Sequence, residues 1–196
     1  MKREAVFFLA FVMIMSLVTG CASTSSMSGK TPFEIIQENE IAISAAGGLA
    51  EVGICSTRTV VLAMDRAQTR GRDQLASRVE SKLNDLKQAF LKEEGPADAG
   101  EINKLFSAAT GHLKHLIVHG MAPKDFQTDS HDNLTTAWAL MVAEPKKLAN
   151  ALAGQSYVSP HLYTRFLASE TFAALDKEIK DFDAFKASRG GMVIAR

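Results

Sequence analysis

Apolar side chains recur at intervals of three or four residues along much of the chain, a spacing typical of helices. The longest such run begins at Ser56 or Thr57 and continues to Glu94, where Gly95-Pro96 ends it. Shorter runs predict helices at 101–117 and 145–154, and Ser159-Pro160 begins a final long helix that extends to about residue 187. The segment 31–34 (TPFE) has the spacing of a capping box with proline at the first helical position, which predicts a short helix at 32–39.

Three further segments have the character of strands. Small apolar residues at 41–46 lead into Gly47-Gly48, which predicts a strand entering a glycine turn where another element packs closely. Residues 134–143 alternate between two sets of side chains that are both fairly apolar, as in a central strand. Residues 120–128 supply its hairpin partner, and the polar cluster 129–133 supplies the turn.

This order of elements predicts an α+β fold. We expect a small, mainly antiparallel three-stranded sheet with long helices on one face, in the order α-β-α-α-β-β-α-α. Three strands leave two sheet edges, which must be covered or must pair with a neighbour. Gly71 lies on the apolar stripe of the longest helix, where glycine costs about 1 kcal/mol relative to alanine, so we expect another element to pack closely against it.

The N-terminus has the pattern of a lipoprotein export signal. A basic start and an apolar run of about 14 residues are too short to span a bilayer comfortably, and residues 18–21 (VTGC) match a lipobox. We therefore expect a signal peptide at 1–20, cleavage between Gly20 and Cys21, and acyl chains on Cys21. Two or more acyl chains bind a membrane durably, so this modification would anchor the protein. The alternative is an ordinary signal peptide with a chance cysteine. Alanine at position 22 favours the outer membrane, with the protein facing the periplasm.

The remaining organisation follows from composition. Residues 21–31 are small and polar and predict a flexible tether, residues 32–189 a single domain, and residues 190–196 a tail with apolar character. Removal of residues 1–20 leaves 20 basic and 21 acidic residues. This balance gives no electrostatic reason to expect nucleic acid as a partner. With Cys21 acylated, Cys55 has no disulfide partner, and we expect a small buried apolar residue there, with a reactive thiol as the alternative.

Few residues form patterns associated with chemistry. His112, His115 and His119 share one helix face and are weak candidate zinc ligands. A fourth ligand could come from Asp129, His131 or Asp132. The favoured interpretation is that the three histidines form a solvated face or cap the C-terminal end of the helix. Ser130 lies between an aspartate and a histidine, but consecutive turn residues cannot form a catalytic triad. We therefore expect no catalytic residues, no cofactor beyond the lipid on Cys21 and no metal site.

Two surface patterns admit more than one interpretation. The arginines at 70, 72 and 78, with Asp73 and Glu80, are typical of a solvated helix face with salt bridges; contact with anionic lipid or cell-wall polymer is the alternative. The phenylalanines of the last helix form an apolar stripe that favours core packing, with a helix-to-helix oligomer seam as the alternative. These residues are Phe166, Phe172, Phe182 and Phe185.

Several of these segments together resemble a known family. The segments are 46–50 (AGGLA), the helix with Ala63, Ala67 and 70–76 (RGRDQLA), and 136–142 (TAWALMV) before a helix with Leu148 and Leu152. With the lipobox, they resemble the Lpp-twenty family of small bacterial outer-membrane lipoproteins, to which flagellar basal-disk lipoproteins are similar. The resemblance covers roughly 41–153 and implies a non-enzymatic envelope protein, in some members one that assembles into rings or disks. The long helix, the inserted second helix and the C-terminal helix depart from the family pattern.

We therefore expect a membrane-anchored envelope lipoprotein whose non-catalytic domain binds other proteins or further copies of itself, through a strand edge or the long helices. Lipid anchoring would raise the effective concentration, so that weak lateral contacts suffice. The alternative is a peptidoglycan-binding module or a periplasmic accessory of an envelope complex.

Overall fold

The computed structural model describes residues 29–189. Contacts divide the chain into two units, Met1–Lys30 and Thr31–Arg196, and the fold given below is that of the second. The expected signal peptide, Cys21 and the tail at 190–196 lie outside the described residues, as does nearly all of the expected tether. No helix among residues 29–189 combines the length and apolar character needed to cross a bilayer.

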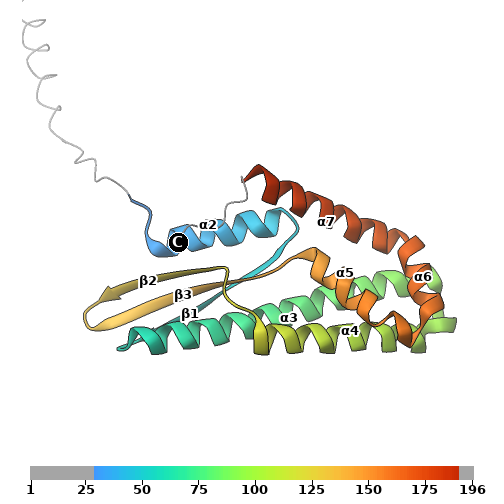
Figure 1. Cartoon of the computed structure of the whole chain (residues 1–196), viewed down its shortest axis with the longest axis horizontal. Coiled ribbons are helices and arrows are strands. Elements are labelled where there is room, and N and C mark those ends of the chain that lie inside the picture. Colours follow the sequence, from blue (N-terminus) through green and yellow to red (C-terminus); the bar gives the residue numbers. More distant parts are fainter. Residues whose placement is uncertain (1–28, 190–196) are drawn as a thin grey trace, which may run out of the picture. The chain divides into compact units, whose positions relative to one another are not determined.

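The α+β prediction is confirmed. Strand β3 lies at the centre of a three-stranded sheet in the order β1-β3-β2, and both pairings are antiparallel (Figure 1). The order of elements also agrees, except that the last predicted helix is divided in two. The elements are α2 (Pro32–Ala45), β1 (Leu49–Thr57), α3 (Val60–Glu94), α4 (Ala99–Gly120), β2 (Asp125–His131), β3 (Leu134–Ala143), α5 (Pro145–Gly154), α6 (Pro160–Ala168) and α7 (Glu170–Ser188), with short 3-10 turns at Pro96–Asp98 and Ser156–Val158.

The strand predicted at 41–46 is wrong. Helix α2 does begin at the predicted capping box, in which Thr31 and Glu34 bond reciprocally, but it continues through residues 41–45. It ends at Ala45, and Gly47, with a φ of 88°, lies in the turn that follows. The first strand follows this turn and contains the β-branched residues Val52, Ile54 and Thr57. Alanine favours helix over strand, so the alanine-rich run joined the helix before it.

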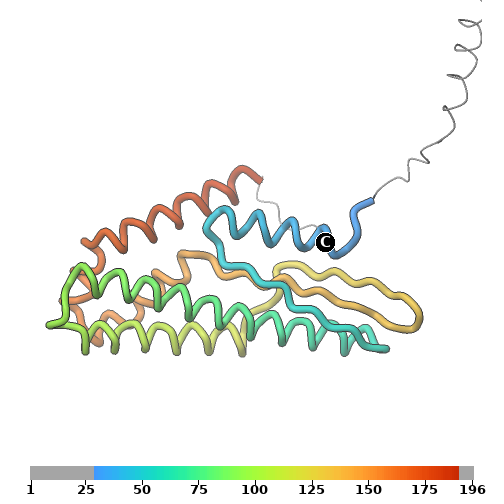
Figure 2. Tube along the Cα trace, turned by 180° about the vertical axis from the view of Figure 1, so that it is seen from behind, coloured from blue at the N-terminus to red at the C-terminus, as the bar shows by residue number. Residues whose placement is uncertain are grey.

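Helices cover both faces of the sheet, which corrects the expectation of one covered face. Along β3, Ala137, Ala139 and Met141 face the long helix α3, whereas Trp138 and Leu140 face α2 and α7. Figure 1 shows α2 and α7 on one side of the sheet and α3 on the other, and Figure 2 shows the same layers from behind. The two apolar sets of β3 therefore match its two covered faces.

The hairpin is shifted along the chain relative to its prediction. Strand β2 covers Asp125–His131 instead of 120–128, because α4 continues to Gly120 and the polar residues 129–131 pair with β3. The turn shortens to Asp132-Asn133, whose φ values of 48° and 63° are those of a tight two-residue hairpin turn. Aspartate and asparagine tolerate this conformation better than other residues with a Cβ.

The predicted final helix breaks at Ser169. The hydroxyl of Ser169 accepts a hydrogen bond from the amide of Phe172 and begins α7. The carboxylate of Glu93, on α3, accepts hydrogen bonds from the amides of Glu170 and Thr171 and from the Thr171 hydroxyl. An anion at a helix N-terminus is favoured by the helix dipole. This contact joins residues far apart in the sequence and could not be expected from local spacing.

Candidate functional site

The residues with the clearest expected role, Gly20 and Cys21, lie outside the described residues. The structure therefore leaves acylation and cleavage as predictions. Cys55, in contrast, is a free thiol that is 4% exposed, packed beside Ala63 and Ala137 between β1, α3 and β3. Its burial agrees with the structural interpretation of this cysteine.

The three helical histidines lie at the C-terminal end of α4 and are exposed. The rings of His115 and His119 are 4.6 Å apart between centroids. Within residues 29–189, no group of three or more His, Cys, Asp or Glu side chains is placed to hold a metal ion. Asp129, His131 and Asp132 lie at the tip of the β2–β3 hairpin, and Ser130 shares a hydrogen bond with Thr135 (2.9 Å between oxygens).

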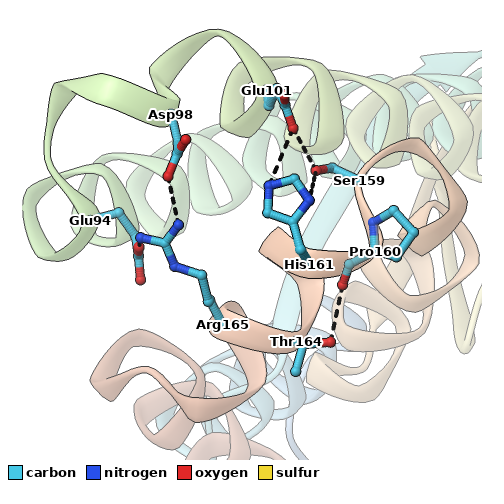
Figure 3. A network of polar contacts seen from close by, with 8 residues as sticks. All are labelled: Glu94, Asp98, Glu101, Ser159, Pro160, His161, Thr164 and Arg165. Atoms are coloured by element: carbon cyan, nitrogen blue, oxygen red, sulfur yellow. Dashed lines mark hydrogen bonds and ion pairs between the residues drawn. The ribbon is translucent and has the colours of Figure 1, made fainter.

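A serine, a histidine and a glutamate do meet elsewhere, where α6 begins (Figure 3). The Ser159 hydroxyl donates to the Glu101 carboxylate at 2.7 Å, while Nδ1 of His161 lies 3.4 Å from the same hydroxyl. A catalytic base must take the proton of the nucleophile, but here the short bond goes to the carboxylate, and Ser159 is 2% exposed. Because Arg165 also pairs with Glu94 and Asp98, these contacts tie α6 to the α3–α4 turn.

The arginines of α3 do not form the predicted salt-bridged face. The guanidinium of Arg70 donates to the carbonyl of Ile54 at 2.7 Å, and that of Arg78 donates to the carbonyl of Ala50 at 3.2 Å and to Glu51. Arg72 donates to the carbonyl of Met121. The side chains turn toward backbone oxygens of β1 and of the α4–β2 connection, which a sequence pattern on one helix cannot reveal.

The phenylalanine stripe belongs to the core. Phe166 is fully buried and makes edge-to-face contacts with Phe90, Phe106 and Phe172. Phe182 packs with Ile36, Ile43 and Leu140 in the layer beneath α2. The default interpretation, core packing, holds for these residues, and Phe182 and Phe185 also border an open space.

That space is a groove of about 690 Å³ between α2, α7, the start of β2 and the connection that follows α4. We call it the α2–α7 groove. Its apolar wall includes Ile35 and Ile43 from α2, Val142 from β3 and Phe182 and Phe185 from α7. A volume of this size is typical of binding sites, which are mostly apolar with a few polar groups.

Charged groups surround the apolar wall. Lys186 pairs with Glu144 and Asp183. The hydrogen bond to Asp183 has the largest effect on the pKa of the Lys186 ammonium and raises it, and the hydrogen bond to Glu144 raises it further. Arg189 stacks on the Phe185 ring, 4.7 Å from its centroid. Lys124 and Lys147 also line the groove, and within residues 29–189 neither makes an ion pair. The groove therefore presents two uncommitted positive charges beside an apolar surface.

Sequence reasoning missed this groove. Its cations lie in the α4–β2 connection, α5 and α7, at positions with no shared spacing, so no motif joins them. The comparisons with known proteins add no further assignment: no protein-family model, curated protein or solved structure matches this chain.

Proposed function

We propose that this protein is a lipid-anchored protein of the bacterial cell envelope whose domain binds a partner protein in the α2–α7 groove. The observation that carries the proposal is the groove itself, with its apolar wall and with Lys124 and Lys147, which have no ion-pair partner among residues 29–189. The lipobox at 18–21 and the resemblance to the Lpp-twenty family support the envelope location.

The chemistry of the groove defines its occupant. Apolar side chains of a partner would contact Val142 and Phe185, and carboxylates would pair with the two lysines. We therefore propose an extended segment that combines apolar and acidic residues. Two-dimensional confinement by the lipid anchor raises the effective concentration of such a partner in the same membrane, so that a modest affinity suffices.

Peptide binding to the full chain in detergent tests this proposal. The probe is a fluorescein-labelled peptide of about eight residues that alternates glutamate and leucine, long enough to lie along a groove as an extended segment. We expect its anisotropy to rise on binding, and a peptide that alternates lysine and leucine to bind at least about tenfold more weakly, since its charges repel those of the groove.

Charge reversal locates the binding. The double variant Lys124→Glu, Lys147→Glu should lose affinity for the acidic peptide by about tenfold or more. The matched control, Lys104→Glu with Lys177→Glu, changes exposed lysines of α4 and α7 outside the groove and should bind as the unaltered chain does. Equal binding of the two peptides, or equal loss in both double variants, would contradict the proposal.

Cell-wall binding is a distinct outcome of the same variants. The groove binds peptidoglycan instead if three results occur together. The chain co-sediments with purified sacculi, the Lys124→Glu, Lys147→Glu variant does not, and the acidic peptide fails to bind. That result would overturn the assignment of a protein partner while leaving the envelope location in place.

A further inference from the structure

The two outer edges of the sheet differ in what covers them. On β1, the backbone carbonyls that point away from β3 include those of Ala50 and Ile54, and both accept hydrogen bonds from arginines of α3. A new strand at this edge would have to displace Arg70 and Arg78. Side chains placed in this way protect an edge from pairing.

The edge of β2 has no such protection. The two-residue turn makes His131 and Leu134 a hydrogen-bonded pair, so alternate residues of β2 point their backbone groups toward β3. Phe126, Thr128 and Ser130 therefore point theirs outward. Within residues 29–189, no side chain or neighbouring backbone forms a hydrogen bond with these outward groups. Strand β2 thus offers an open row of donors and acceptors.

We propose that this edge pairs with the β2 edge of a second copy of the chain. The two strands run antiparallel about a two-fold axis at Thr128, and the two sheets join into one. This self-association goes beyond the proposed partner groove and does not depend on it.

Charge complementarity selects the register. Centred on Thr128, all of β2 overlaps with its copy, Asp125 lies opposite His131, and Gln127 lies opposite Asp129. In each pair, a donor group faces a carboxylate. A shift of the centre to Gln127 would place Asp125 opposite Asp129, and a shift to Asp129 would place that carboxylate opposite itself, which like charges disfavour.

Removal of one outward amide tests the pairing. Proline at position 128 removes an N–H that points away from β3, which an edge strand tolerates. We expect the full chain in detergent to form dimers by sedimentation equilibrium, Thr128→Pro to remain monomeric, and Thr128→Val, which keeps the amide, to form dimers as before. Circular dichroism and thermal melting of the two variants check that both are folded.

A charge exchange tests the register without altering the backbone. His131→Asp places a carboxylate opposite Asp125 at both symmetric positions, and we expect dimerisation to weaken by about tenfold. The double variant Asp125→His, His131→Asp restores an opposite pair and should recover dimerisation. A structural defect at the hairpin would not be repaired by the second change.

Three results would overturn the proposal: a chain that remains monomeric at every concentration, dimers that persist in Thr128→Pro, or a double variant that associates no better than His131→Asp. The single groove variant Lys147→Glu changes α5 and leaves β2 and its flanking residues unaltered, so it should still form dimers. Failure of edge pairing can therefore be distinguished from failure of the proposed partner binding.

Discussion

At the scale of single residues, Glu40 shows how packing changes the chemistry of a side chain. It lies on α2, where partial burial raises the pKa of its carboxyl, the nearby Glu51 carboxylate raises it further, and Arg78 opposes both. Glu51 forms a salt bridge with Arg78 at 2.8 Å. Two carboxylates, those of Glu40 and Glu51, therefore lie near a single guanidinium, and only Glu51 is paired with it. Neither burial nor the approach of Glu51 follows from the sequence around Glu40.

The raised pKa makes stability depend on pH. A carboxyl that holds its proton more tightly in the folded state favours folding below its ordinary pKa of 4.5, and this contribution is lost as the pH rises through the folded value. Glu40→Gln should therefore be more stable than the unaltered chain at pH 7 by a few tenths of a kcal/mol, since the site is largely solvated. Below pH 4.5 the advantage should disappear.

Urea denaturation at several pH values measures this difference. The control is Asp85→Asn, an exposed residue of α3 that neutralises a carboxylate away from Glu51. If the stabilities of Glu40→Gln and the unaltered chain differ by the same amount at pH 4 and pH 7, the raised pKa has no part in stability.

At the scale of elements, two glycines set the approach of β1 to α3. A Cβ on Gly53 would lie 1.9 Å from the carbonyl oxygen of Ala67 and 2.3 Å from the amide nitrogen of Gly71. A Cβ on Gly71 would lie 2.7 Å from Cγ of Met141. The expectation that an element packs closely against Gly71 is thus confirmed, and the neighbouring elements are β1, through Gly53, and β3, through Met141. Gly48 likewise permits a close approach, here of α7, since a Cβ on Gly48 would lie 2.5 Å from the Phe182 ring.

Gly53→Ala should be strongly destabilising. The added methyl group meets backbone atoms that cannot rotate away, so the strand and helix must separate, at a cost on the order of 3 kcal/mol or more. Gly111→Ala is the matched control, because a Cβ there has nothing within 4 Å; it should stabilise α4 by up to about 1 kcal/mol. Thermal melting of both variants makes the comparison, and similar melting temperatures would contradict the close packing.

At the scale of the whole molecule, the expected anchor and the folded domain have separate determinants. The lipobox predicts attachment at Cys21, whereas the other cysteine, Cys55, is buried in the domain.

Cys21→Ser should abolish acylation. The thiol is the group that accepts the lipid, so we expect the variant to incorporate no labelled palmitate and to keep residues 1–20 uncleaved. Cys55→Ser is the matched control: it removes a thiol of the same chain and should keep both label and signal cleavage, since Cys55 has little exposure. Normal labelling of Cys21→Ser would contradict the lipoprotein assignment.

The sequence by itself determined the fold class, most helices and the central strand, since these follow from local periodicity. The stop at Gly95-Pro96, the capping box at Thr31 and the two apolar faces of β3 are all local signals, and the structure has each of them. The boundary between α2 and β1 was misplaced because a run of small apolar residues suits a buried helix or a strand, and only its neighbours decide.

Tertiary structure alone decided the rest. The break at Ser169 depends on Glu93 from another helix, the covered edge of β1 depends on Arg70 and Arg78 from α3, and the groove gathers lysines from segments with no common pattern. The physical reason is the same in each case. A hydrogen bond, a close approach or a shared cavity depends on distance in space, whereas a sequence pattern records only distance along the chain.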